Sequence, residues 1–370
     1  MSIHFHSLRI KEIRKETPEC VSILFDIPDN LKNDFQFKQG QSLTMRTTIR
    51  NEEVRRTYSI CSSPLDNEIR VAIKKADGGL FSTFANESLK PDDLLQVMEP
   101  VGKFYTDLYP GQKKNYLAFA AGSGITPVLS LIKTTLATEP ASSFTLVYGN
   151  RSRGSIIFFE ELEGLKNKYL QRFNFINILS REKTDAPINF GRINTDKLKQ
   201  LSKLIAYEKM DETFICGPEE MIFSVKDFLE QKGINKKRIH FELFTTPGSG
   251  KSEVRGQKSE VTLRQAQGQK SEFVTDYKSK ITVKLDGRSF DFNLGYNDDA
   301  ILDAALKQGA DLPYACKGGV CCTCKARLIE GEVEMDVHWG LEDEEIQQGY
   351  ILTCQSHPKT DKVVVDFDIK

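Results

Sequence analysis

The chain has 370 residues, a formal net charge of -1 and 39% hydrophobic residues. A chain of this length is expected to form two or three domains, and its balanced charge gives no indication of nucleic-acid binding. No apolar run approaches the roughly 20 residues that a bilayer-spanning helix needs, so the sequence predicts no membrane insertion.

Residues 1–108 are predicted to form an antiparallel β-barrel, because they contain short strand-like runs separated by Pro, Asn, Asp and Gly. Two landmarks lie within this region. The first is Arg55-Arg-Thr-Tyr-Ser-Ile60, and the second is the glycine turn Asp77-Gly-Gly79, which is expected to open a helix at Leu80. Free backbone N–H groups at such a helix start can bind a phosphate, with Ser82 or Thr83 adding a hydroxyl. The strand-like runs are residues 4–10, 20–25, 41–46, 70–74 and 94–97.

These landmarks, followed by Glu99-Pro-Val-Gly-Lys-Phe104, resemble the flavin domain of the ferredoxin-NADP reductase superfamily. The resemblance implies that Arg56 pairs with a flavin phosphate, that Tyr58 lies along the isoalloxazine ring and that Ser59 lies near flavin N5. The second phosphate-binding turn favours FAD, although some relatives use FMN, and an arginine-tipped strand of no special role is the bland alternative. The full set of implied flavin contacts is Arg56, Thr57, Tyr58, Ser59, Gly79, Ser82 and Thr83.

Residues 109–246 are predicted to form an α/β domain with a parallel sheet. Four strand-like segments each end at a turn, and helical segments lie between them, which is the pattern of repeated βα units. Ligands of such sheets bind at the carboxyl ends of the strands, where all four turns lie. The turns begin at Gly122, Gly149, Ser180 and Gly217.

In the same superfamily, the Gly-x-Gly-x-Thr-Pro turn receives the pyrophosphate of the nicotinamide nucleotide. The resemblance therefore implicates Gly122, Gly124, Thr126 and Pro127. It also implies that Cys216, Gly217 and Pro218 flank the nicotinamide, with Cys216 as a wall of the hydride site rather than a nucleophile. His240-Phe-Glu-Leu-Phe244 resembles the terminal strand of the superfamily, in which Glu242 and Phe244 would approach the flavin; a simple edge strand is the alternative.

The choice between NADPH and NADH depends on the ribose 2′ position. Arginine accommodates a 2′-phosphate, whereas an acidic residue accepts hydrogen bonds from a 2′-hydroxyl. Arg151, Arg153, Ser180 and Arg181 follow the relevant strands, so the sequence favours NADPH. NADH stays possible, because these arginines can also be solvated surface residues and Glu182 is next to them.

Residues 247–279 are predicted to be a flexible polar linker. The sequence Lys-Ser-Glu recurs at Lys251, Lys258 and Lys270, and the segment has almost no large apolar residues. Such a segment cannot bury enough surface to offset the entropy of ordering.

Residues 280–370 contain the cysteine spacing of a plant-type 2Fe-2S cluster. Cys316, Cys321 and Cys324 follow the C-x4-C-x2-C pattern, and Cys354 completes it. A zinc site is the alternative, although zinc ligands usually occur in CxxC or Cys/His pairs. Cys322 is interpreted as a loop residue. With such a site and no export signal, we expect a cytoplasmic protein.

A short helix over residues 299–309 and the Leu312-Pro-Tyr-Ala315 segment precede the first cysteine. Together with the cysteine string they resemble the plant-type ferredoxin family, which implies a β-grasp fold with Cys316, Cys321, Cys324 and Cys354 as cluster ligands. Acidic residues between 330 and 345 could steer a basic partner, although such a run is more often a solvated face.

The order of flavin barrel, nucleotide domain and ferredoxin resembles the reductase components of multicomponent oxygenases. Residues 149–152 and 156–159, with the cysteine string, look most similar to the reductase subunits of phenylacetyl-CoA epoxidases. The resemblance implies electron flow from NADPH through FAD and the 2Fe-2S cluster to a partner oxygenase. Reductases of Rieske-type hydroxylases, desaturases or hybrid-cluster proteins share this architecture. A redox relay or sensor without nucleotide turnover is an alternative of another class.

Overall fold

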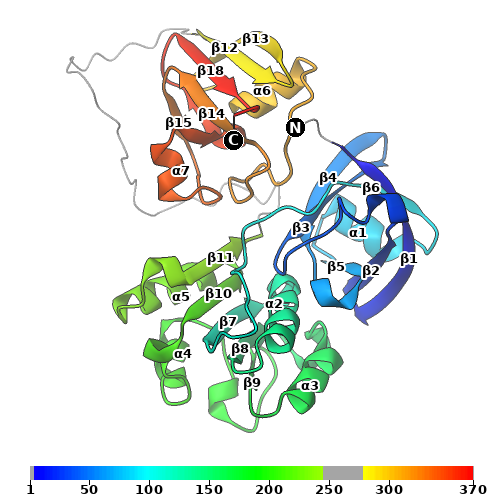
Figure 1. Cartoon of the computed structure of the whole chain (residues 1–370), viewed down its shortest axis with the longest axis vertical. Coiled ribbons are helices and arrows are strands. Elements are labelled where there is room, and N and C mark those ends of the chain that lie inside the picture. Colours follow the sequence, from blue (N-terminus) through cyan, green and yellow to red (C-terminus); the bar gives the residue numbers. More distant parts are fainter. Residues whose placement is uncertain (1–3, 245–277, 370) are drawn as a thin grey trace. The chain divides into compact units, whose positions relative to one another are not determined.

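The computed structural model describes residues 4–244 and 278–369, which form two compact units (Figure 1). The predicted linker over residues 247–279 lies outside the described residues, except for its last two, which belong to the first strand of the second unit. Among the described residues, none of the helices combines the length and the apolar composition that crossing a bilayer requires.

The first part of the larger unit is the predicted antiparallel sheet. Six strands follow the order β4-β3-β6-β1-β2-β5, and a bridge between Ile60 and Val71 connects the end of β4 to β5. Apolar side chains from alternate strand positions, such as Leu8, Ile23 and Val71, form the closed core. The elements are β1 (His6–Thr17), β2 (Cys20–Asp26), β3 (Ser42–Ile49), β4 (Glu52–Ser59), β5 (Ile69–Lys74), α1 (Leu80–Glu87) and β6 (Leu94–Val97).

Strand β4 was not among the strand-like runs expected from the sequence, in which Arg55–Ile60 was a motif with an arginine-tipped strand as the alternative. Its residues pair with β3 along the whole length from Glu52 to Ser59. Three of these residues are charged or polar and half-buried, so the segment lacks the alternation that marks a strand. The pairing with β3 therefore decides the local structure.

The second part of the larger unit is the predicted parallel sheet. Its strand order is β11-β10-β7-β8-β9, and all neighbouring pairs are parallel. Helices α2 and α3 lie on one side of this sheet and α4 and α5 on the other (Figure 1). The elements are β7 (Asn115–Ala121), α2 (Ile125–Thr138), β8 (Ser143–Asn150), α3 (Phe159–Lys168), β9 (Phe173–Leu179), α4 (Thr195–Leu201), β10 (Glu212–Gly217), α5 (Glu219–Gln231) and β11 (Ile239–Leu243).

Helix α2 packs against the segment that leaves the barrel after β4. The Ser130 hydroxyl donates to the backbone oxygen of Ser62 at 2.6 Å, and the hydroxyls of Ser63 and Thr134 lie 2.9 Å apart. Lys133 forms an ion pair of 2.6 Å with Asp66 on the barrel side. These buried polar contacts fix the barrel against the parallel sheet.

The smaller unit is a mixed five-stranded sheet packed on helix α6, as the β-grasp prediction requires. The strand order is β13-β12-β18-β14-β16, with β12 and β18 parallel and the other pairs antiparallel. The helix expected at residues 299–309 is shorter, because it ends before Gly309, which has a φ of 90°. The elements are β12 (Lys278–Leu285), β13 (Arg288–Gly295), α6 (Ile301–Lys307), β14 (Lys325–Glu330), β15 (Val333–Met335), α7 (Asp343–Gln347), β16 (Tyr350–Leu352), β17 (Ser356–Pro358) and β18 (Lys362–Asp366).

One glycine of the barrel allows a close backbone approach that we predict to be essential. Gly40 has a φ of 86°, and a Cβ atom there would lie 2.0 Å from the backbone oxygen of Phe104. Gly40→Ala should therefore lower the unfolding temperature measured by calorimetry and cost about 3 kcal/mol or more. Gly164→Ala is the matched control, because a Cβ at this exposed position of α3 meets nothing within 4 Å. It should stabilise the protein by about 0.5–1 kcal/mol, and equal effects of the two changes would contradict the prediction.

Candidate functional site

Strand β4 presents the predicted flavin residues in a row. Tyr58 is half-buried, and its ring centroid lies 5.6 Å from that of Phe81 at the start of α1. Burial raises the pKa of the Tyr58 phenol, so the ring is a neutral, largely apolar surface. The Arg56 side chain donates to the backbone oxygen of Arg55 at 2.7 Å and forms no ion pair with a carboxylate of the described residues. An aromatic plate beside an arginine without an acidic partner fits a flavin with its phosphate.

The predicted glycine turn before α1 is present, but the Ser82 hydroxyl forms hydrogen bonds within the turn and is not left for a phosphate. Gly79 is the N-cap residue of α1, and the backbone N–H of Thr83 donates to its carbonyl oxygen. The Ser82 hydroxyl accepts from the backbone N–H of Ala76 and donates to the Gly79 carbonyl oxygen. Since Ser82 is buried, its hydroxyl stabilises the turn, and backbone N–H groups are left as the phosphate donors of this segment.

Three of the predicted catalytic residues converge from three strands. The Ser59 hydroxyl at the end of β4 donates to a carboxylate oxygen of Glu242 at 3.3 Å, and Glu242 in β11 is the register partner of Cys216 in β10. Burial raises the pKa of Glu242 to about 7, although the Ser59 hydrogen bond opposes the shift. Burial, and next the nearby Glu242, raises the pKa of the Cys216 thiol well above its usual value. A neutral thiol is a poor nucleophile, which suits the interpretation of Cys216 as a wall.

Phe244, the last described residue of the larger unit, directly follows β11 and its side chain is 42% exposed. An aromatic ring with this exposure can still cover a flat ligand. Phe244 lies two positions after Glu242 in the chain, and its approach to the flavin stays a prediction.

The Gly-x-Gly turn between β7 and α2 packs directly on the end of β10. A Cβ atom at Gly124 would lie 2.1 Å from the backbone oxygen of Cys216. Gly122 has a φ of 54°, and its carbonyl oxygen accepts a hydrogen bond of 2.9 Å from the Tyr148 hydroxyl. The Thr126 hydroxyl donates to the Ser123 carbonyl oxygen at 3.0 Å, so it holds the turn from within. Glycine is thus required here for packing, and the amino end of α2 is a kind of site that can bind a pyrophosphate.

Gly217 and Pro218 follow Cys216 in the chain, and Gly217 lies next to the Gly-x-Gly turn. Gly217 has a φ of 158°, and a Cβ atom at this position would meet the Met221 side chain at 2.8 Å and Ala121 at 3.1 Å. Pro218 is the N-cap residue of α5. The segment is therefore fixed between β7 and α5.

The residues assigned to the ribose 2′ position lie together at the ends of β8 and β9. The backbone N–H of Arg181 donates to the Arg151 carbonyl oxygen at 2.8 Å, and that of Ser180 to the Asn150 carbonyl oxygen at 2.9 Å. Both arginine side chains are exposed and neither forms an ion pair within the described residues. Arg151 and Arg181 can therefore face an anion together.

Two neighbours of this group have different environments. The Arg153 guanidinium lies over the Phe159 ring, 5.0 Å from its centroid, and its backbone N–H donates to a carboxylate oxygen of Glu182 at 2.8 Å. The Arg153 guanidinium is therefore engaged with α3. Because Glu182 is occupied by this contact, its effect on the nucleotide preference is reduced.

Two further residues at this edge were missed by sequence reasoning. The Lys74 ammonium group lies 3.8 Å from the position of a Cβ atom on Gly122, although Lys74 belongs to β5 of the barrel. Phe190 forms a parallel bridge with Leu179 and is 46% exposed, one position from the Ser180 strand end. Lys74 is close to the Asp77-Gly-Gly79 turn in sequence, which was a usable signal. No signal in the sequence pointed to Phe190, because a long loop brings this residue back to β9.

The four predicted cluster cysteines form two pairs. The thiol of Cys321 hydrogen-bonds to that of Cys316 and lowers the pKa of Cys316 to about 6, and the pairing raises the pKa of Cys321. Cys324 and Cys354 interact in the same way, and the charge of Cys321 also acts on Cys324. No disulfide connects any of them.

This arrangement distinguishes between a cluster and a zinc ion. In the described residues, no three cysteine sulfurs lie within 4.8 Å of one another. A tetrahedral zinc ion with bonds of about 2.3 Å would bring all four sulfurs within about 3.8 Å. Two separate pairs instead match two iron ions, each with two thiolates.

The cluster loop is held by its own backbone and by the segments around it. The Gly318 N–H donates to the Cys316 sulfur at 3.3 Å. Gly319 has a φ of 71°, and a Cβ atom there would lie 2.9 Å from the Val337 carbonyl oxygen. The Gln355 side chain donates to the Lys317 and Cys354 carbonyl oxygens. These contacts preorganise N–H groups toward the thiols, as an iron-sulfur cluster needs.

Cys322 and the acidic run have local partners. The Cys322 thiol donates to the Gly340 carbonyl oxygen at 2.7 Å, which agrees with its interpretation as a loop residue. Three of the acidic side chains form ion pairs with lysines: Glu330 with Lys362, Glu334 with Lys359 and Glu345 with Lys325. The neutralised charges reduce the steering that the sequence suggested.

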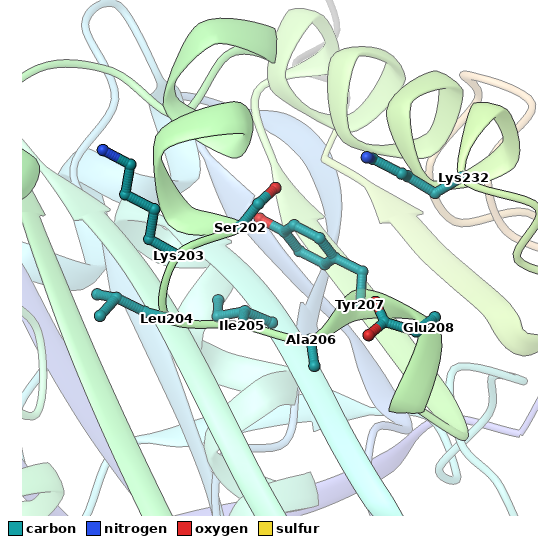
Figure 2. A pocket seen from close by; sticks show the side chains of 8 residues that line it. All are labelled: Ser202, Lys203, Leu204, Ile205, Ala206, Tyr207, Glu208 and Lys232. Atoms are coloured by element: carbon teal, nitrogen blue, oxygen red, sulfur yellow. The ribbon is translucent and has the colours of Figure 1, made fainter.

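A cavity of about 420 Å³ in the larger unit lies away from all of these residues (Figure 2). Its wall is the segment from Ser202 to Glu208, which leads into the amino end of β10, and Lys232 after α5. Cofactors of parallel sheets bind at the opposite, carboxyl edge. This cavity is therefore separate from the nucleotide site.

Comparisons with known proteins agree with this geometry. Residues 7–105 match an oxidoreductase FAD-binding domain, residues 119–227 an oxidoreductase NAD-binding domain and residues 283–359 a 2Fe-2S iron-sulfur cluster binding domain. The chain is 45% identical over 367 residues to one of the subunits of the 1,2-phenylacetyl-CoA epoxidase of Escherichia coli (strain K12), covering 99% of this chain and 98% of the relative.

It is also 32% identical to the ferredoxin reductase component of 3-ketosteroid-9-alpha-monooxygenase of Rhodococcus rhodochrous, covering 97% of this chain and 96% of the relative. Phthalate dioxygenase reductase has a similar structure, with a TM-score of 0.57 at 22% identity and 98% of both chains covered. The three matched regions and the similarity over nearly the whole chain lead to one assignment: the chain belongs to the family of oxidoreductases that join FAD-binding and NAD-binding domains to a 2Fe-2S ferredoxin domain.

Proposed function

We propose that this protein is the reductase component of a multicomponent oxygenase, passing electrons from NADPH through FAD and the 2Fe-2S cluster to an oxygenase, and that the oxygenase is a phenylacetyl-CoA epoxidase. The observation that supports it most is the presence, in one chain, of the Ser59, Cys216 and Glu242 junction and of the paired cluster thiols. The 45% identity to a component of such an epoxidase over 99% of the chain supports the choice of partner.

The bound FAD would accept two electrons as a hydride and release them singly to the cluster. The residues of this chain orient the reactants and exclude water. With both cofactors bound, the turn at Gly122 and Gly124 would hold the nucleotide against the Cys216 backbone, and the uncharged Cys216 thiol would border the nicotinamide. Ser59 and Glu242 would hold a hydrogen-bonded proton at the flavin edge.

The partner is tested by reconstitution. With the oxygenase subunits of a phenylacetyl-CoA epoxidase, this protein should support NADPH-dependent epoxidation of phenylacetyl-CoA, measured by mass spectrometry of the product. Cys324→Ser should abolish epoxidation and the electron paramagnetic resonance signal of the reduced cluster, because serine is a poor cluster ligand, yet NADPH should still bleach the flavin. Cys322→Ser is the matched control and should keep all three activities, since Cys322 bonds to the Gly340 carbonyl oxygen.

Reconstitution with other oxygenases can give the result that would contradict the proposed partner. The same wild-type protein is tested with the oxygenases of 3-ketosteroid and glycine betaine monooxygenases, whose reductases are also similar to this chain. Faster turnover with either of these, and none with the epoxidase, would show that the proposed partner is wrong while the reductase assignment holds.

We further propose that the nucleotide is NADPH. Arg151 and Arg181 lie at neighbouring strand ends, joined by the hydrogen bond between their backbones, and neither has an acidic partner among the described residues. The exposed Phe190 ring lies beside the same strand end and offers a surface for the adenine. Lys74 supplies a positive charge close to the Gly122 turn.

Arg181→Ala should lower the ratio of kcat/KM for NADPH to that for NADH by about tenfold to a hundredfold, because one charge-assisted hydrogen bond to the 2′-phosphate is lost. The change should appear mainly in the KM for NADPH, measured as ferricyanide reduction. Arg153→Ala is the control, since the Arg153 guanidinium lies over Phe159. An unchanged ratio in Arg181→Ala, or an equal loss in Arg153→Ala, would refute this assignment.

The buried carboxyl of Glu242 predicts a pH dependence of stability. Its pKa is about 7 in the folded protein, above the usual 4.5, so the folded state binds the extra proton. The resulting stabilisation is complete below about pH 4.5 and is lost as the pH rises to about 7. Glu242→Gln should therefore match the wild type near pH 5 and be more stable at pH 8.5, by at most about 3 kcal/mol.

The measurement is the calorimetric unfolding temperature of both proteins from pH 5 to 8.5. Glu220→Gln removes an exposed carboxyl of α5 and should leave the pH profile unchanged. A difference between Glu242→Gln and the wild type that stays constant with pH would mean that Glu242 is ionised throughout this range.

A further inference from the structure

Three segments of the barrel bring together one imidazole and two carboxylates that none of the redox sites uses. His6 is the first residue of β1, Asp34 follows the short helical turn Asp29–Leu31, and Glu99 follows β6. One nitrogen of His6 and one oxygen of each carboxylate all lie within 4.8 Å of one another. No other group of three such side chains occurs in the parts of the chain that the structure describes.

The imidazole is fixed, and its Nε2 atom lacks a hydrogen-bond partner. Its Nε2 atom is buried and forms no hydrogen bond, although the side chain as a whole is 20% exposed. The Glu99 oxygen is 3.7 Å away, which is too far for a hydrogen bond. The ring packs edge-on against the buried Phe35, with centroids 5.4 Å apart, so it is held in this orientation. A buried nitrogen without a partner is costly and indicates a missing ligand.

The two carboxylates also lack a cation. Within residues 4–244 and 278–369, neither Asp34 nor Glu99 forms an ion pair with a lysine or an arginine. This contrasts with Asp29 on the same loop, which pairs with Lys32 at 2.6 Å. Two negative charges so close together repel each other unless a positive charge lies between them. A nitrogen and two carboxylates therefore lie around one centre, and no lysine or arginine of the described residues pairs with them.

We propose that His6, Asp34 and Glu99 form a divalent cation site of the zinc class, with solvent at the remaining coordination position. An imidazole nitrogen with two carboxylate oxygens is a donor set that Zn²⁺ binds well, whereas Mg²⁺ and Ca²⁺ prefer oxygen ligands alone. Zinc bonds of about 2.1 Å require the three atoms to move closer together. The exposed side chains of Asp34 and Glu99 can make this movement, and His6 need not move.

A bound cation would connect the first strand of the barrel to segments 28 and 93 residues further along the chain. Such a link stabilises the folded barrel in proportion to the occupancy of the site. Because metal ligands must be deprotonated to bind, the affinity of the site for the cation should weaken in acid.

The test uses tag-free protein that retains its cluster. After equilibrium dialysis against about 100 µM Zn²⁺, elemental analysis should find one zinc per chain with the iron content unchanged, and the unfolding temperature of the barrel should rise. His6→Gln and Glu99→Gln should each weaken zinc binding at least about tenfold, because one of three ligands is lost. A tenfold excess of Mg²⁺ should not displace the zinc.

His4→Gln is the matched control, since it removes an imidazole two residues away and leaves the three ligands in place. It should bind zinc like the wild type. Equal zinc binding by His6→Gln, Glu99→Gln and the wild type would contradict the proposed site. Zinc uptake accompanied by an equal loss of iron would also contradict it. Absence of bound zinc in wild type at this concentration would overturn it as well. Because none of the three residues is placed near a redox cofactor, these outcomes are independent of the proposed reductase function.

Discussion

In the larger unit, the arrangement of the predicted cofactor-binding residues depends on a contact between two backbone segments. Gly124, in the turn after β7, lies against the Cys216 carbonyl oxygen, and any side chain on Gly124 would overlap that oxygen at 2.1 Å. Because Cys216 is paired in register with Glu242, and Glu242 with the Ser59 hydroxyl, this contact links the nucleotide turn to the flavin strand through three neighbouring positions. Reactants held on such a framework start close to the geometry that hydride transfer needs. With the cofactors bound as proposed, a shift of the turn would disturb both of them at once.

The junction around Cys216 and Glu242 and the ferredoxin unit differ in how their charges are arranged. Around Cys216 and Glu242, burial favours the neutral forms of both side chains, so the junction carries little charge and leaves the orientation of a hydride donor to packing. In the ferredoxin unit, three of the eight acidic residues that looked like a docking surface, Glu330, Glu334 and Glu345, form ion pairs with lysines. These ion pairs lower the net negative charge that this face could offer to a basic partner.

Much of the fold follows from the sequence, because it rests on local patterns. The βα repeats and the cysteine spacing are properties of short segments, and the structure has the corresponding parallel sheet and the two thiol pairs. Strand β4 was offered only as an alternative interpretation of its motif, since its polar residues are stabilised by pairing with β3 rather than by their own alternation. The hydroxyls of Ser82 and Thr126 show a second limit. Sequence reasoning offered the Ser82 hydroxyl to a phosphate and placed Thr126 in the pyrophosphate turn, but the folded chain uses both inside their own turns.

The same limit explains which site residues were missed. Lys74 belongs to the barrel and reaches the Gly122 turn only after the two parts pack together, and Phe190 returns to β9 through a loop with no periodic pattern. Arg153 shows the converse, because its sequence position matches the 2′ site while its guanidinium lies over Phe159. Residue type and order therefore indicate which chemistry a strand end can support. The side chains that provide it are selected by long-range packing, which a single sequence records only indirectly.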